Sequence, residues 1–263
     1  MVCHGRCRSW HGHLAHGSLW PLPFVARASC PCVAGASCPC KGVPITVEIH
    51  SFVLGPFETN SYLLLGERTV TGGDGPRDAW VIDPSMGAER LIEAARRAGA
   101  GVRWVLLTHG HADHIAGIGQ LRRVWPDLKI ACPRADVVML TDARANLSAE
   151  FNLPVTVGPA DELLEAGRTL VGEGFELTVI ATPGHTPGGV SFHCPQLGAV
   201  FTGDALFAGS VGRSDLPGGD HEQLIASIRR GLLSLGDDTQ VLPGHGPATT
   251  IGQERRTNPF LLL

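Results

Sequence analysis

The sequence predicts an α/β fold in which two β-sheets pack face to face and helices cover their outer sides. Short strand-like runs alternate with amphipathic segments in two successive halves of the chain, an order that is typical of layered α/β domains. The chain has 263 residues, 43% of them hydrophobic, which is enough to bury one sizeable core. We therefore expect a single folded domain that spans residues 43–263.

The first elements are expected to be strands followed by a helix. Runs rich in Val, Ile, Leu and aromatic residues predict strands at 45–54, 61–65 and 79–82. The segment 89–98, with the sequence ERLIEAARRA, places its apolar residues on one face of a helix, and Gly99 ends that helix.

A buried strand then leads directly into a polar segment. The apolar run 102–107 has the length of a strand, and the residues THGHADH follow it at once. Helical spacing of apolar residues predicts helices at 115–124 and 134–145, the second opened by Pro133. A short strand is expected between these helices, at 130–132.

The second half of the domain is expected to consist mainly of short strands. Apolar runs separated by Gly and Pro turns predict strands at 169–171, 176–181, 190–193 and 199–201. A helix at 221–233 then precedes a last strand at 240–242. The two halves together therefore supply two sheets and the helices that cover them.

Residues 1–42 differ in composition from the rest of the chain. They contain six of the eight cysteines and no acidic residue. Their repeated CPC motif has one residue between the cysteines, where zinc knuckles usually have two, and the apolar run of a signal peptide is interrupted by Pro21 and Pro23. A zinc module, a signal peptide and an Arg-bearing transit peptide are minor interpretations. We expect a disordered extension or a translation start placed too far upstream.

Composition excludes several classes of function. The formal net charge is −4 and no basic stripe is present, so nucleic acid is not the expected ligand. No run approaches the roughly 18 consecutive apolar residues that span a bilayer, so no membrane partner is expected. The two cysteines after residue 42, Cys132 and Cys194, are far apart, as in reduced proteins. The expected location is therefore the cytoplasm.

The segment THGHADH carries four potential metal ligands, which are His109, His111, Asp113 and His114. Alternate residues of an extended chain point the same way, so the first two histidines can bind one ion. Asp113 and His114 lie where the chain turns into the next helix and can face a second ion. A single buried histidine usually belongs to a hydrogen-bonded core or loop, but that explanation does not account for four such residues at once.

Three further candidates lie where strand-like runs give way to loops. They are His185 in PGHT, Asp204 in GDAL and His245 in PGHG. Loops beyond strand ends commonly carry ligand-binding groups. Imidazole and carboxylate ligands with no thiolate suit Zn, Fe or Mn, and such ions can activate water for hydrolysis. A serine nucleophile is not indicated, because Ser191 and Ser210 lack a GxSxG setting.

The complete pattern, HxHxDH followed by His, Asp and His, resembles that of the metallo-β-lactamase superfamily over about residues 44–250. The resemblance implies an αββα sandwich of two mixed β-sheets flanked by helices. It also implies two divalent metal ions per chain, Zn first and Fe or Mn as alternatives. The implied ligands are His109, His111 and His185 for one ion, Asp113, His114 and His245 for the other, and Asp204 as the bridge.

The same resemblance assigns roles to other residues. Asp113 and Asp204 are the implied catalytic residues. Asp83 in VIDPS corresponds to a further acid of the family that orients a metal ligand, and Asn60 and Tyr62 in TNSYLL also fit the family's early strand.

The segment 203–220, GDALFAGSVGRSDLPGGD, resembles the short bacterial members of the glyoxalase II group. Those enzymes hydrolyse thioesters such as S-lactoylglutathione, so the resemblance implies a small-molecule thioester substrate. Antibiotic hydrolysis is disfavoured, because true β-lactamases usually lack the bridging aspartate. Persulfide dioxygenases, which hold one iron with two His and one Asp, share TPGHT and GDAL with this chain and are the main alternative. A lactonase is the other.

The sequence departs from full-length glyoxalase II enzymes in the contacts to glutathione. Full-length glyoxalase II enzymes supply them from a helical domain, whereas only Arg255 and Arg256 follow His245 as basic residues here, and Tyr62 is the one tyrosine. A thioester without glutathione is therefore also considered. Arg213 either binds an anionic group of the substrate or pairs with a carboxylate such as Asp215.

Overall fold

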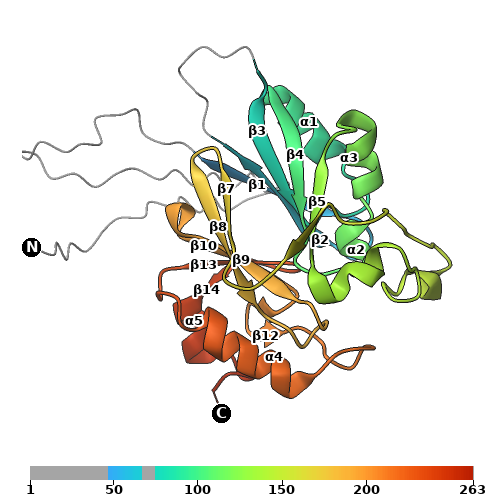
Figure 1. Ribbon diagram of the computed structural model, residues 1–263. Coiled ribbons are helices and arrows are strands. Elements are labelled where there is room, and N and C mark those ends of the chain that lie inside the picture. The colour runs from blue at the N-terminus through green and yellow to red at the C-terminus, as the bar shows by residue number, and fades with distance from the viewer. Residues whose placement is uncertain (1–46, 67–74, 263) are drawn as a thin grey trace, which may run out of the picture.

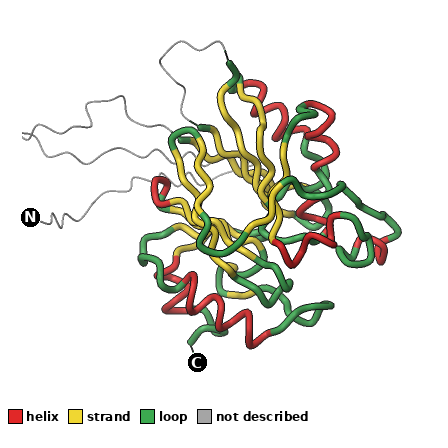
Figure 2. Tube along the Cα trace, viewed as in Figure 1, coloured by secondary structure: helices red, strands yellow, loops and turns green. Residues whose placement is uncertain are grey.

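Two six-stranded β-sheets pack face to face in the computed structural model, which describes residues 47–66 and 75–262 (Figure 1). Helices lie on the outer side of each sheet, so the layers run helix, sheet, sheet, helix (Figure 2). This arrangement is the predicted αββα sandwich, and both sheets are mixed. The predicted extension at 1–42 lies outside the described residues.

The first sheet contains six strands in chain order. They are β1 (Glu48–Leu54), β2 (Thr59–Leu65), β3 (Arg77–Ile82), β4 (Ala100–Leu106), β5 (Lys129–Pro133) and β6 (Glu162–Leu164). β1 to β3 pair antiparallel, and β3 to β6 pair parallel. The carboxyl ends of β3, β4 and β5 therefore meet at one edge, where ligand-binding loops are common.

The second sheet has the order β14-β13-β10-β9-β8-β7. Its strands are β7 (Thr169–Gly172), β8 (Phe175–Ala181), β9 (Val190–Cys194), β10 (Ala199–Gly203), β13 (Gln240–Pro243) and β14 (Thr249–Thr250). Only the β10–β13 pair is parallel. The hairpin of β11 (Leu206–Phe207) and β12 (Ser210–Val211) stands apart from this sheet. The loops after β10 and β13 therefore leave the sheet at the same edge.

Short helices cover the outer sides of the sheets. The first sheet carries α1 (Glu89–Arg97), α2 (Ala112–Ile115) and α3 (Ile118–Val124), and the second carries α4 (His221–Ser227) and α5 (Ile251–Thr257). Side chains cap the last two, because Asp220 accepts from Gln223 N–H and Thr250 accepts from Gln253 N–H. None of the helices in the described ranges has the length and apolarity to cross a bilayer.

The core lies between the sheets and extends under the helices on both sides. Tyr62, Trp80, Phe175, Phe192 and Phe201 are buried between the two sheets. Every residue of β2 is buried, because its inward side chains face the second sheet and its outward leucines face α1 and α3. A third cluster joins the second sheet to α4 and α5. The strand ends that carry the candidate ligands therefore rest on a packed scaffold.

The predicted elements are present with shifted ends, but two predicted helices were wrong in form. The helix expected at 115–124 is divided into α2 and α3 at Gly117, where the backbone passes so close to Ser85 that a Cβ would meet its carbonyl oxygen at 2.3 Å. The helix expected at 134–145 is a 3-10 helix, η1 (Arg134–Leu140). It ends early because Asp142 accepts bonds from the next turn.

Other differences concern elements in the second half of the chain. The helix expected at 221–233 is α4 followed by a π-helical turn, η4 (Ile228–Leu232). The sequence patterns did not indicate β6, the β11–β12 hairpin, β14, α5, or the 3-10 helices η2 (Ser148–Phe151) and η3 (Pro195–Leu197). Each is short, so periodicity over it is too weak to detect.

Candidate metal centre

The segment with four predicted ligands forms the loop between β4 and α2 and the start of α2 itself. β4 ends at Leu106 and α2 begins at Ala112, so a strand and a helix fix both ends of the loop. His111 is the extended residue that precedes α2, with φ −64° and ψ 150°. Asp113 and His114 lie within α2. The change from loop to helix therefore turns the second pair of side chains away from the first.

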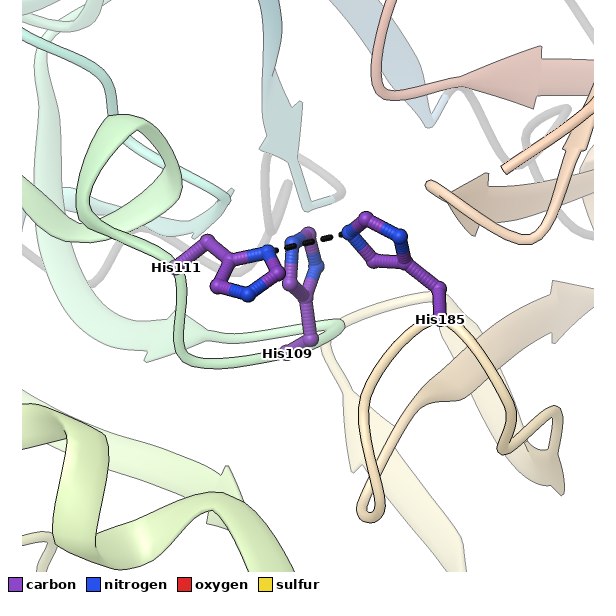
Figure 3. Close-up of side chains that lie close together, drawn as sticks. All are labelled: His109, His111 and His185. Atoms are coloured by element: carbon purple, nitrogen blue, oxygen red, sulfur yellow. Dashed lines mark hydrogen bonds between the residues drawn. The ribbon is translucent and has the colours of Figure 1, made fainter. Parts of the chain in front are cut away.

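His109, His111 and His185 point toward one another (Figure 3). One donor atom of each lies within 4.8 Å of the others, and His111 Nδ1 is 3.0 Å from His185 Nε2. All three side chains are buried. His185 comes from the loop after β8, and its Nδ1 donates to the carbonyl oxygen of Arg213 at 2.7 Å. That bond leaves Nε2 free to face the other histidines.

Asp113, His114 and His245 form a second group with the same spacing limit of 4.8 Å. Asp113 Oδ2 lies 3.3 Å from His114 Nε2 and 3.2 Å from His245 Nε2. His245 comes from the loop after β13, and its Nδ1 donates to the carbonyl oxygen of Phe57 at 3.0 Å. Thr59 Oγ1 donates to Asp113 Oδ2 at 2.9 Å. Each group therefore contains residues of both sheets.

Asp204 lies between the two groups. Its Oδ2 is 3.6 Å from His185 Nε2 in the first group. Its Oδ1 is 3.4 Å from His114 Nε2 and its Oδ2 is 3.5 Å from His245 Nε2, both in the second group. Asp204 follows β10, and the parallel pairing of β10 with β13 brings it beside His245. All seven predicted residues thus lie together at one edge of the sandwich.

The potential ligand atoms of these seven residues leave hydrogen-bonding capacity unused, which a divalent cation would satisfy. Three of them are buried with no hydrogen-bond partner, namely His109 Nε2, His114 Nε2 and Asp204 Oδ1. Leaving a polar atom buried and unpaired costs about 1–3 kcal/mol, and a bound cation would offset that cost. Imidazole nitrogens and carboxylate oxygens are ligands that Zn, Fe and Mn accept. The residues present therefore suit a metal site.

The pKa values of His109 and His111 are shifted in the opposite direction from those of His114 and His245. Burial and the charges of neighbouring imidazoles lower the pKa of His109 well below its usual range and that of His111 to about 3. Burial also opposes protonation of His114 and His245. For His114, however, the charges of Asp113 and Asp204 raise its pKa well above its usual range, and hydrogen bonds to the same carboxylates raise the pKa of His245 to about 10. The carboxylates thus favour positive charge between them.

Asp83 orients His114, in the position that the family resemblance implies. Its Oδ1 accepts from the N–H of Thr108 at 2.8 Å, and its Oδ2 accepts from the hydroxyl of Thr108 at 2.6 Å. Asp83 Oδ2 also lies 3.0 Å from His114 Nδ1. A further group of possible ligands, Asp83 with His109 and His114, is explained by this network. His114 Nδ1 is engaged there, so Nε2 is the atom that faces Asp113 and Asp204.

Strand β2 holds the loop that carries His245. Asn60 Nδ2 donates to the carbonyl oxygens of Pro243 and Gly246 at 3.0 and 2.9 Å. The hydroxyl of Tyr62 donates to the carbonyl oxygen of Pro243 at 2.7 Å. The side chains of Asn60 and Tyr62 therefore hold the His245 loop, which gives a structural role to two residues that the sequence only associated with an early strand.

Asp136 joins the two loops of the first histidine group and was missed in the sequence. Its Oδ2 accepts from the hydroxyl of Thr186 at 2.6 Å and from the N–H of Gly110 at 3.3 Å, and its Oδ1 accepts from the N–H of Gly188 at 2.7 Å. Gly110 lies between two candidate ligands and Thr186 follows a third. Nothing in the pattern around Asp136 indicated this, because an acid in a predicted helix is normally exposed.

We expect Asp136→Asn to weaken metal binding by about 10–100-fold, the usual effect of altering a residue that orients ligands. Donors approach both oxygens of Asp136, so an amide nitrogen at either position would face another donor. Chelator competition measures the affinity. Asp142→Asn is the control, because exposed Asp142 accepts through Oδ1 alone and an amide keeps that acceptor. Equal affinity of Asp136→Asn and wild type would contradict the role.

A cavity of about 570 Å³ opens beside the candidate centre. His111, Asp113, His185, Asp204 and His245 form its inner wall. The volume is within the range of small-molecule sites, about 300–1,000 Å³. The candidate ligands are therefore accessible to a small molecule from one side.

Arg213 lies on the rim of this cavity with its guanidinium paired. Its Nε and one terminal nitrogen donate to the two oxygens of Asp215 at 2.8 and 2.9 Å. Both side chains are exposed, and this bidentate pair corresponds to the second of the two interpretations considered for Arg213. The backbone of Arg213, through its bond to His185, contributes more directly to the centre.

Comparison with known proteins gives one family. The protein-family model described as "Metallo-beta-lactamase superfamily" matches residues 54–245 of the chain. Hydroxyacylglutathione hydrolase GloC of Haemophilus influenzae is 40% identical over 190 residues, which cover 72% of this chain and 89% of that protein. The "Probable metallo-hydrolase YqgX" of Bacillus subtilis is 35% identical over 209 residues, covering 79% of this chain and 94% of that protein.

Solved structures similar to this one agree with that family. The BLEG-1 structure, described as a B3 metallo-β-lactamase, has a TM-score of 0.73 at 37% identity and covers 82% of this chain and 100% of its own. TTHA1623 in a di-iron-bound form has a TM-score of 0.66 at 40% identity, covering 80% and 99%. ETHE1 from Myxococcus xanthus has a TM-score of 0.64 at 27% identity, covering 80% and 83%.

Proposed function

We infer the reaction from one premise: the chain belongs to the metallo-β-lactamase superfamily. We propose that it is a binuclear metal-dependent hydrolase of small thioesters, similar to hydroxyacylglutathione hydrolase. The observation that carries the proposal is the position of Asp204. This carboxylate lies within 3.6 Å of imidazoles from both groups of candidate ligands, as a bridge between two ions would.

The proposal assigns each candidate ligand to one of two ions. His109, His111 and His185 would hold the first, and Asp113, His114 and His245 the second. The similarity to TTHA1623, whose structure is described as di-iron-bound, supports two ions and leaves Zn, Fe and Mn open. These residues would hold the ions where they could lower the pKa of a bound water molecule toward about 7 and polarise a carbonyl group.

The residues around the ligands keep this arrangement in place. Thr59 holds the carboxylate of Asp113, Asp83 holds the ring of His114, and the carbonyl oxygen of Arg213 holds the ring of His185. Each bond fixes one ring or carboxylate orientation before substrate enters. The cavity lets a thioester carbonyl approach Asp204, His185 and His245 from the open side.

Metal removal and a substrate panel test the proposal. Chelation should abolish thioester hydrolysis, and adding back about two equivalents of Zn, Mn or Fe should restore it. The panel contains S-lactoylglutathione, a thioester of a neutral thiol, a lactone and a β-lactam, since BLEG-1 is described as a lactamase. Turnover of the β-lactam or the lactone without any thioester would overturn the proposed reaction.

A mononuclear-iron persulfide dioxygenase is the second candidate. It would use His185, Asp204 and one histidine of THGHADH, and the similarity to ETHE1 is compatible with it. The presence of the second group, Asp113 with His245 and His114, favours the hydrolase. Oxygen uptake that depends on persulfide, with one iron per chain and no thioester hydrolysis, would establish the dioxygenase instead.

A further inference from the structure

The outer part of the cavity is apolar. Phe57, Met86, Phe151, Leu153, Phe207 and Leu216 line it. The first four are exposed by 48%, 36%, 60% and 52%. They make up four of the nine large hydrophobic side chains that are exposed within the described residues. Such a concentration around one opening marks a binding surface for apolar groups.

Two of these side chains form a wall that is tied to the candidate centre. The rings of Phe57 and Phe151 meet edge to face with centroids 5.2 Å apart, although they come from the turn after β1 and from η2. The carbonyl oxygen of Phe57 accepts the bond from His245 Nδ1. The aromatic wall therefore stands at a fixed distance from the atoms on which the reaction depends.

Charged groups are scarce in the same cavity. Apart from the candidate ligands, Glu150 and Arg213 are the only charged residues in its described lining. Arg213 is already engaged with both oxygens of Asp215. A glutathione moiety carries carboxylates, which need cationic or N–H partners when they bind. Apart from the candidate ligands, the described lining offers one cationic side chain, Arg213, and that side chain is paired with Asp215.

We propose that the preferred substrate is a thioester with an uncharged apolar arm that lies against Phe57 and Phe151, and that glutathione thioesters are poor substrates. This inference rests on the proposed thioester hydrolysis and specifies its substrate class. The apolar arm is either the acyl chain or the thiol chain, since both flank the reacting carbonyl. Contact with the arm removes both rings from water and so favours its binding.

A series of thioesters tests the preference. Acetyl and octanoyl thioesters of N-acetylcysteamine vary the acyl arm, S-octyl thioacetate varies the thiol arm, and S-lactoylglutathione supplies the charged arm. With metal-loaded protein, we expect kcat/KM to rise at least about tenfold from the acetyl compound to one of the octyl compounds, and S-lactoylglutathione to be slower than both. The octyl compound whose kcat/KM rises identifies which arm of the substrate contacts the aromatic wall.

Variants connect the preference to the aromatic wall. In Phe57→Ala/Phe151→Ala, the ratio of kcat/KM for the preferred octyl compound to kcat/KM for the acetyl compound should fall by about tenfold. Phe260→Ala is the matched control, because Phe260 is also exposed, by 42%, and lies outside the cavity. In metal-free protein, 8-anilinonaphthalene-1-sulfonate should bind wild type and Phe260→Ala alike and the double variant more weakly.

The outcomes separate this inference from the proposed function. The proposed apolar arm would be overturned if S-lactoylglutathione were hydrolysed faster than every octyl compound. It would also be overturned if the double variant kept the octyl preference. Neither result would contradict the proposed thioester hydrolase activity. Equal dye binding by wild type and the double variant would also overturn the apolar arm. Failure of metal-loaded protein to hydrolyse any thioester would instead refute the proposed function.

Discussion

Replacing Asp204 with Ala is expected to lower thioester turnover by on the order of a thousandfold or more. Its carboxylate lies within 3.6 Å of His114, His185 and His245. Without it, the proposed ions bound by those imidazoles would have one negative charge fewer to balance them. Both candidate groups lose a shared partner, so the loss should exceed that from any residue serving only one of them.

Bound metal per chain and kcat/KM for a thioester measure this prediction together. Wild type should hold about two ions after dialysis, and Asp204→Ala about one or fewer, because a bridging carboxylate contributes to both ions. Asp238→Ala is the control, since Asp238 is an exposed acid on the surface and its loss changes the net charge equally. A variant at Asp204 that keeps two ions and near-normal turnover would show that this residue is no bridge.

The sequence could predict the candidate ligands because local rules place them. HxHxDH follows a buried strand, so strand geometry and the start of α2 decide where its side chains point. His185, Asp204 and His245 each follow a strand that was recognised from its apolar run. Their assignment as metal ligands stays a prediction, but their convergence follows from the topology, because the ends of these strands lie at the same edge of the two packed sheets.

Residues that support the centre from elsewhere could not be predicted in this way. Asp136 lies in a segment whose apolar spacing indicated an ordinary helix, and its partners Gly110 and Thr186 are 26 and 50 residues away. Thr59 contacts Asp113 across 54 residues. The pairing of Phe57 with Phe151 is equally remote. Such contacts arise from tertiary packing, which no periodicity of the sequence encodes.

Gly203→Ala is expected to destabilise the protein by about 3 kcal/mol even without metal. Gly203 has φ +48°, a left-handed backbone that costs a side chain roughly 1–2 kcal/mol. A Cβ there would also meet Thr108 Oγ1 at 2.2 Å and Thr108 Cβ at 2.6 Å. Thr108 cannot move aside cheaply, because its hydroxyl and N–H are both bound to Asp83, so overpacking adds about 1–3 kcal/mol.

The other end of β10 provides the matched control for that substitution. Gly198 precedes the strand with φ +58°, and a Cβ there would have no atom within 4 Å, so Gly198→Ala should cost only the roughly 1–2 kcal/mol of backbone strain. Urea unfolding of both chelated variants measures the difference. Because Thr108 and Asp83 also orient His109 and His114, only Gly203→Ala should release metal more readily to a chelator. Equal stabilities of the two variants would contradict this prediction. They would show that Thr108 moves to accommodate a Cβ at residue 203 without loss of the hydrogen bonds to Asp83.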